Sequence, residues 1–219
     1  SKAIKDHYKP YGPLDNCPET KLSSILAIID KLDTLSGFFS INKEPTSSKD
    51  PYALRRAGLG IIRIILKEQF SFDLCLLLEK SLTKYYDTKI LKLEKNKEIR
   101  EQVIEKIKKF ILERLENFLK DSYKFNSYIY ESLVLKSDSI NILKIKYNCD
   151  LLNQYIISKG GVDFLVAFKR ITNILESEKY SDLCFQKDLL KSEPEKNLYI
   201  EYNKVLNLID SSTCKEAKT

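Results

Sequence analysis

The spacing of apolar residues along this chain follows the period of an α-helix and not the alternation of a β-strand. The clearest example is residues 97–120, where apolar side chains recur every three or four positions and form one face. This face comprises Ile99, Val103, Ile107, Phe110, Ile111, Leu115 and Phe118. Charged residues occupy the opposite face, so the pattern predicts a long amphipathic helix near the middle of the chain.

The same period predicts helices over most of the remaining sequence. They are expected at residues 22–39, 51–68, 73–86, 126–134, 139–158, 161–176 and 195–209. In the first of these, the predicted apolar face consists of Leu22, Ile25, Leu26, Ile29, Leu32 and Leu35. Residues 123–130 are the best strand candidate but alternate poorly, and Gly160-Gly161 indicates a helix break. The predicted fold class is all-α, with several helices.

The predicted helix that follows Asp50 has an unusual distribution of charge. Asp50 can accept hydrogen bonds from the free N–H groups of the first turn, and Pro51 suits the first helical position. Arg55 and Arg56 follow at once, although the helix dipole favours negative charge at this end. Either Asp50 compensates for the two arginines, or the arginines bind something outside the helix, such as a phosphate.

Composition narrows the class of protein. The chain has 219 residues, of which 43% are hydrophobic and 31% charged, as is usual for a soluble globular protein. No apolar run is long enough to cross a membrane, and residues 1–6 do not resemble a secretory signal. Five scattered cysteines are typical of reduced thiols in a cytoplasm. The absence of Met suggests a segment of a longer protein, and the net charge of +6 is compatible with an anionic partner.

Three ordered blocks of sequence carry a resemblance to a known family. Residues 49–64 read Lys-Asp-Pro-Tyr-Ala-Leu-Arg-Arg-Ala-Gly-Leu-Gly-Ile-Ile-Arg-Ile, residues 27–35 contain Asp-Lys-Leu-Asp-Thr-Leu, and residues 167–175 contain Lys-Arg-Ile-Thr-Asn-Ile-Leu. Each block is similar to a segment of the β subunit of bacterial heterotetrameric glycyl-tRNA synthetase, and the order of the blocks is the same. The sequence between about 68 and 160 is too diverged to align residue by residue.

The resemblance implies a domain organisation and a function. Residues 1–45 would be the C-terminal part of an HD-like helical domain, residues 50–210 a helical tRNA-binding or scaffold region similar to an anticodon-binding domain, and residues 211–219 a polar tail. The chain would be a cytoplasmic segment of the glycine–tRNA ligase β subunit that binds tRNA(Gly) within an α2β2 assembly. In this family the α subunit carries the aminoacylation chemistry with ATP and Mg²⁺, so this segment is expected to hold no catalytic residue and no cofactor.

The residues expected to contact tRNA are basic positions in two of the three blocks. They are Lys49, Arg55, Arg56, Arg63, Lys169 and Arg170. The planar guanidinium group of arginine binds phosphate through two parallel hydrogen bonds, which makes it well suited to this role. The alternative is that Arg55 or Arg56 forms a buried salt bridge that holds two helices or two domains together.

Two other functions are compatible with parts of the sequence. Asp30 matches an aspartate of the HD phosphohydrolases and lies three residues from Asp33, so the pair could bind a divalent cation. The sole histidine, His7, is not part of a His-Asp pair, and it is expected on the surface. No metal site is therefore predicted, and Asp30 and Asp33 are interpreted as solvated acids. The other alternative is an all-α protein-interaction module whose lysines only face water.

Phosphate-binding glycine loops are absent from the sequence. Gly58 and Gly60 lie inside a predicted helix, where small residues are expected to let another helix approach closely.

Overall fold

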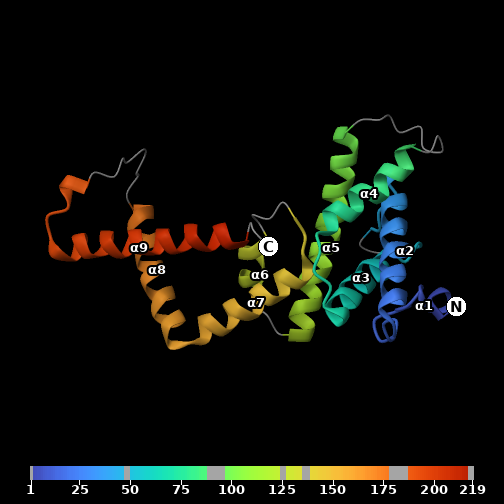
Figure 1. The fold of residues 1–219 in the computed structure, drawn as a ribbon, viewed down its shortest axis with the longest axis horizontal. Helices are drawn as coiled ribbons and strands as arrows, with labels where there is room; N and C mark the ends of the chain where they lie inside the picture. Colours follow the sequence, from blue (N-terminus) through green and yellow to red (C-terminus); the bar gives the residue numbers. More distant parts are fainter. Residues whose placement is uncertain are drawn as a thin grey trace. The chain divides into compact units, whose positions relative to one another are not determined.

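The structure, a computed structural model, describes residues 2–46, 50–87, 97–123, 127–134, 139–177 and 187–216, and all regular elements in these ranges are helical (Figure 1). The predicted all-α class is therefore confirmed. The helices are α1 (Lys2–Asp6), α2 (Lys21–Ser40), α3 (Leu54–Glu68), α4 (Leu74–Asp87), α5 (Lys97–Tyr123), α6 (Ser127–Val134), α7 (Ile142–Ile157), α8 (Lys159–Ser177), the 3-10 helix η1 (Lys187–Leu189) and α9 (Glu193–Glu216). None of the described helices is both long and apolar enough to cross a membrane.

Two compact units make up the chain, residues 1–165 and residues 166–219. The expected division near residues 45–50 does not coincide with the boundary between these units, because α2 packs directly against α3, α4 and α5. Of the predicted polar tail, residues 211–216 continue α9. The assignment of residues 1–45 to an HD-like domain and of residues 50–210 to an anticodon-binding-like region stays a prediction.

Helix α3 lies at the centre of the first unit, in contact with α2, α5 and α7 (Figure 1). Most of its apolar side chains are buried, and Leu59 is half-buried. The core formed around it includes Leu54, Ile61, Ile62, Ile64 and Ile65 of α3, Ala27, Ile28, Leu35 and Phe39 of α2, and Ile107, Ile111 and Leu115 of α5. The predicted apolar face of residues 97–120 is confirmed for its middle part, while Ile99 and Phe118 are only half-buried.

Two glycines of α3 allow its neighbours to come close, as expected. A Cβ atom on Gly58 would lie 3.2 Å from side-chain carbons of both Phe110 and Arg114 on α5. A Cβ atom on Gly60 would lie 2.7 Å from Cε of Lys31 on α2. Larger residues at these positions would force the neighbouring side chains to move, so the glycines determine how closely α3 packs.

The predicted start of α3 is wrong by three residues. Pro51 does not occupy the first helical position but lies in a turn that Ala53 ends with a left-handed backbone, φ 57°. The helix begins at Leu54, yet Asp50 still caps it by reaching over the turn. Its Oδ1 accepts a hydrogen bond from the Leu54 N–H at 2.8 Å, and its Oδ2 accepts one from the Arg55 N–H at 3.0 Å.

The predicted apolar face of α2 is also wrong in part. Leu22, Ile25 and Ile29 are 68%, 46% and 55% exposed. Helix α2 carries apolar residues on two faces, and the buried face is the one that also has the small residues Ser24 and Ala27. Small side chains permit close packing against another helix, and this decides which of the two faces is covered.

The break expected at Gly160-Gly161 lies slightly earlier in the structure. Helix α7 ends at Ile157, Ser158 separates it from α8, and both glycines belong to the first turn of α8. A Cβ atom on Gly161 would lie only 1.9 Å from the Tyr155 carbonyl oxygen. The sharp turn between the two helices therefore requires glycine at this position.

The Asp50 cap can be tested by substitution. We expect Asp50→Ala to lower the free energy of unfolding by about 1 kcal/mol, because two N–H groups of the first turn of α3 lose their acceptors. Asp50→Asn keeps one acceptor oxygen and should show a smaller loss. The measurement is urea denaturation followed by circular dichroism, and equal stability of all three proteins would contradict the capping role.

Candidate nucleic-acid interface

Three cationic side chains hold the N-terminal segment, defined as residues 8–18, against helices α2 and α3. Arg63 donates from Nη1 to the Gly12 carbonyl oxygen at 2.9 Å and from Nη2 to the Asp15 carbonyl oxygen at 2.6 Å. Lys67 donates to the carbonyl oxygen of Pro18. All of these acceptors are neutral carbonyl groups, so they do not cancel the charge of Arg63, whereas Lys67 also pairs with the Glu68 carboxylate at 3.4 Å.

Lys31 is the third cation, and it is 94% buried, since only 6% of its surface is exposed. Its Nζ donates to the Tyr8 carbonyl oxygen at 2.9 Å. Burial lowers the pKa of Lys31, because the charged ammonium group loses hydration. The sequence did not indicate this burial, although Lys31 does lie on the same face of the helix as Ile28 and Leu35.

Of the residues predicted to contact tRNA, Arg55 and Arg56 lie side by side at the start of α3. Arg55 donates from Nη2 to the Thr46 carbonyl oxygen, and Arg56 is exposed. Within the described ranges, neither arginine forms an ion pair with a carboxylate. The buried salt bridge considered as their alternative role is therefore not observed there.

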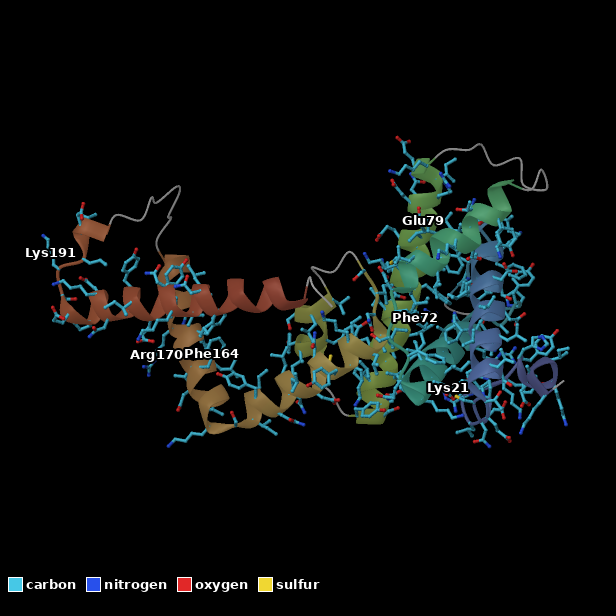
Figure 2. The ribbon with its side chains drawn as sticks, in the orientation of Figure 1. Lys21, Phe72, Glu79, Phe164, Arg170 and Lys191 are labelled. Carbon is cyan, nitrogen blue, oxygen red and sulfur yellow. The ribbon has the colours of Figure 1, made fainter. Side chains whose placement is uncertain are left out.

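The other predicted positions are spread over the chain. Lys49 lies outside the described residues. Lys169 and Arg170 are exposed on the part of α8 that belongs to the second unit. Figure 2 shows the position of Arg170 on this helix. Contact with tRNA at any of the six positions stays a prediction, and the structure groups Arg55, Arg56 and Arg63 on one helix.

A surface groove, here called the basic groove, runs past two of these arginines. It consists of three adjoining hollows of about 640, 550 and 390 Å³. The first and second hollows share Arg63 and Phe118, and the second and third share Leu66 and Tyr123. The groove therefore extends along α3 from Arg55 towards α7.

Cations outnumber acids in the lining of the basic groove. Its cationic residues are Arg55, Arg63, Lys67, Arg114, Lys144 and Lys146, and its acidic residues are Glu19, Glu113, Asp121 and Asp150. Of the acids, Asp150 pairs with Lys146 at 2.5 Å, while Glu19 pairs with Lys2, which does not line the groove. The excess of positive charge favours an anionic ligand.

Arg114 is a groove residue that the sequence analysis did not identify. Its guanidinium carbon lies 3.3 Å from the centroid of the Phe110 ring, and its Nη1 donates to the Phe110 carbonyl oxygen at 2.5 Å. Its Nε is buried without a hydrogen-bond partner, and burial lowers its pKa. Arg114 is four residues from both Phe110 and Phe118, so it lies on the apolar face of the helix. A cation at such a position is the sequence feature from which this residue could have been found.

Aromatic residues line the other end of the groove. Tyr123 is 43% exposed, and Nζ of Lys146 lies 4.8 Å from its ring centroid. Tyr147 of α7 is 59% exposed and lines the third hollow together with Lys144 and Lys146. Cations interleaved with exposed rings are typical of surfaces that bind nucleic acids.

Asp33, which was considered for a metal site, and the sole histidine, His7, contact other groups of the protein. Asp33 accepts hydrogen bonds from the Tyr85 hydroxyl at 2.8 Å and from the Ser81 hydroxyl at 3.5 Å. Nδ1 of His7 lies 2.5 Å from the carbonyl oxygen of Ile4. Within the described ranges, no three side chains of His, Cys, Asp or Glu are grouped as metal ligands.

The described cysteine thiols are free, in agreement with the expectation of reduced cysteines. Cys17 and Cys75 are half-buried, and Cys149 is fully buried. Burial raises the pKa of all three thiols, and that of Cys149 to about 11.

Comparison with known proteins gives consistent similarities. The profile of the family described as glycyl-tRNA synthetase beta subunit matches residues 1–134. The glycine–tRNA ligase beta subunit of Rickettsia canadensis is 36% identical over 215 residues, which are 98% of this chain and 30% of that protein. The corresponding subunit of Clostridioides difficile is 34% identical over 205 residues, 94% of this chain and 28% of that protein. The chain thus spans about 30% of the length of the curated relatives it matches.

The hydrogen bond between Tyr85 and Asp33 makes stability depend on pH at the alkaline end. Burial, together with the Asp33 carboxylate, raises the pKa of Tyr85 to about 12, against 10 for a free tyrosine. The unfolded chain therefore loses its proton first, and the stabilisation, complete below about pH 10, is lost as the pH rises towards 12. We expect Tyr85→Phe to be less stable near pH 8 and to lose less stability between pH 10 and 12.

The measurement is the urea midpoint of unfolding over this pH range. Tyr11→Phe, which removes an exposed hydroxyl group, is the matched control and should keep the alkaline loss of the unsubstituted chain. The same pH profile for Tyr85→Phe and the unsubstituted chain would contradict the role of this hydrogen bond.

Proposed function

Because the chain belongs to the glycyl-tRNA synthetase β-subunit family, we propose that it binds tRNA(Gly) as part of a glycine–tRNA ligase β subunit. In this role it supports the ATP-dependent attachment of glycine to tRNA. Its own contribution is to bind the RNA and to form a rigid helical support, without residues that react.

The basic groove is the observation that carries this proposal. Its cations Arg55 and Arg63 donate to carbonyl groups, which leaves their charge available to a phosphate backbone, whereas Lys67 also pairs with the Glu68 carboxylate at 3.4 Å. Phosphate contacts of this kind provide most of the affinity of proteins for nucleic acids. Arg56, exposed beside Arg55, extends the same basic surface outside the groove.

The rest of the reaction belongs to the other parts of the enzyme in this proposal. The α subunit binds ATP with Mg²⁺ and carries out the aminoacylation, and two copies of each subunit form an α2β2 assembly. The segment needs no cofactor of its own, and the assembly acts in the cytoplasm, where translation takes place. These statements rest on family membership.

Nothing in the described ranges favours the HD-type phosphohydrolase considered above, since no three side chains of His, Cys, Asp or Glu are grouped there as metal ligands. Exposed apolar residues favour a protein-interaction module; they include Leu22, Ile25 and Ile29 on α2 and Val166 and Ile171 on α8. The two functions differ in their response to salt. RNA binding weakens as salt rises, whereas burial of apolar surface does not weaken in this way.

Titration of the 219-residue chain with a tRNA(Gly) transcript, followed by fluorescence anisotropy at several salt concentrations, tests the proposal. We expect the logarithm of the affinity to fall linearly with the logarithm of the salt concentration. Arg55→Gln should weaken binding about tenfold, since one charge-assisted contact contributes about 1.5 kcal/mol, and should reduce the salt slope by about 1.

Lys109→Gln is the matched control, because it removes one positive charge from an exposed position of α5 that does not line the groove. Its affinity should stay within about twofold of that of the unsubstituted chain. Absence of tRNA binding at low salt, or equal effects of the two substitutions, would count against RNA contact through the groove.

A further inference from the structure

The basic groove changes in character from one end to the other. The first hollow contains three arginines, Arg55, Arg63 and Arg114, which come from two helices. The third hollow contains two lysines and two tyrosines, Lys144, Lys146, Tyr123 and Tyr147. Arginine forks suit phosphate oxygens, and exposed aromatic rings suit the flat faces of bases. The two ends therefore suit different parts of one nucleotide chain.

The first hollow has more arginines than carboxylates, so its positive charge is only partly balanced. Arg114 has a buried Nε without a hydrogen-bond partner, and its positive charge lies close enough to Arg55 for the two to repel each other. Glu113 approaches Arg114 only to 4.0 Å. An anion in this hollow would relieve the repulsion between the two guanidinium groups.

The tyrosine end presents an open ring. Tyr147 is 59% exposed, and within the described residues it has neither a ring contact nor a side-chain hydrogen bond. Exposing a ring of this size to water has a cost that stacking of a base removes. Lys144 and Lys146 line the same hollow, where the adjoining phosphate of a stacked nucleotide would lie, and Asp150, paired with Lys146 at 2.5 Å, balances one of the two charges.

The dimensions of the groove favour a single strand. Arg55 and Leu66 are eleven residues apart on α3, which at about 1.5 Å per residue gives a length of about 16 Å before the third hollow is reached. Each hollow has a volume within the range of small-ligand sites, which suits separate nucleotides. Duplex RNA is instead bound across its wide, shallow minor groove by elements that contact it from outside.

We propose that the basic groove binds an unpaired segment of RNA, with backbone phosphates at Arg55, Arg63 and Arg114 and a base stacked on Tyr147. This inference rests on the proposed RNA-binding function. It adds that the RNA is unpaired, that its phosphates lie at the arginine end of the groove, and that one base stacks on Tyr147. RNA binding alone would require none of these three features.

The sequence contains no Trp, so a single Trp introduced at Tyr147 reports on the groove without background. We expect the fluorescence of the Tyr147→Trp chain to be quenched by a short single-stranded oligoribonucleotide of mixed sequence. The same oligonucleotide annealed to its complement should quench it much less. Tyr155→Trp, on the same helix and 49% exposed but outside the groove, is the matched control and should not be quenched.

Two further substitutions separate stacking from simple contact. Tyr147→Ala should weaken binding of the single strand at least about fivefold, the lower end of the effect of one stacked base. Tyr147→Phe keeps the ring and should bind within about twofold of the unsubstituted chain. Because Tyr147 is exposed, neither substitution removes a buried side chain from the core.

The proposal is overturned if the duplex binds as tightly as the single strand, if both Trp reporters respond alike, or if Tyr147→Ala binds the single strand normally. These failures differ from a failure of the proposed function. A chain that binds tRNA with a strong salt dependence but shows one of these three results keeps its RNA-binding function and loses only the unpaired-strand inference. A chain that binds no RNA at any salt concentration loses both.

Discussion

The close contact of α3 with α2 and α5, through Gly60 and Gly58, is the constraint on which the rest of the structure depends. Gly58 brings α3 against Phe110 and Arg114 of α5, and Gly60 brings it against Lys31 of α2. The isoleucines of α3 then fill the space between the helices and form the core. The distance between α3 and α5 also determines how far Arg114 lies from Arg55. The shape of the first hollow of the basic groove therefore depends on how tightly the core is packed.

A second consequence concerns the charges. Cations close to the core need hydrogen-bond acceptors, because a buried ammonium or guanidinium group without partners is unfavourable. Here the acceptors of Lys31, Arg63 and Lys67 are carbonyl groups of residues 8–18. A carboxylate in place of these carbonyl groups would have neutralised Arg63, as Glu68 does in part for Lys67 at 3.4 Å. With carbonyl acceptors, the N-terminal segment is held in position and the positive charge of Arg63 remains.

The sequence was sufficient to predict what depends on local spacing. The apolar face of α5 repeats regularly, and five of its seven predicted residues are buried, while Ile99 and Phe118 are half-buried. Helix α2 has two apolar faces, and the choice between them depends on Ser24 and Ala27 meeting another helix, which periodicity does not reveal. The start of α3 was placed too early because the left-handed turn at Ala53 contradicts the usual preference of a residue that is not glycine.

The site was predicted in part for the same reason. Arg55, Arg56 and Arg63 were visible as charges on a helix, and Arg114 could have been found from its spacing to Phe110 and Phe118. The partners of Arg63 could not, because Gly12 and Asp15 are about fifty positions away in an irregular segment. Tyr147 and the groove itself arise from packing between α3, α5 and α7, and only the folded chain brings these helices together.

Fixing the cations in advance also affects how a ligand is bound. An arginine or lysine side chain loses up to about 2 kcal/mol of conformational freedom when it is held in one place. For Arg63 and Lys67 this loss occurs on folding, when they bond to the N-terminal segment, and not on binding. Both residues therefore contribute to the stability of the fold and to the charge of the groove. A substitution at either position changes both properties together. Arg55 and Arg56 are the positions at which the two effects are most nearly separated. Among the described residues, the Arg55 side chain donates only to Thr46, and the Arg56 side chain has no hydrogen-bond or ion-pair partner.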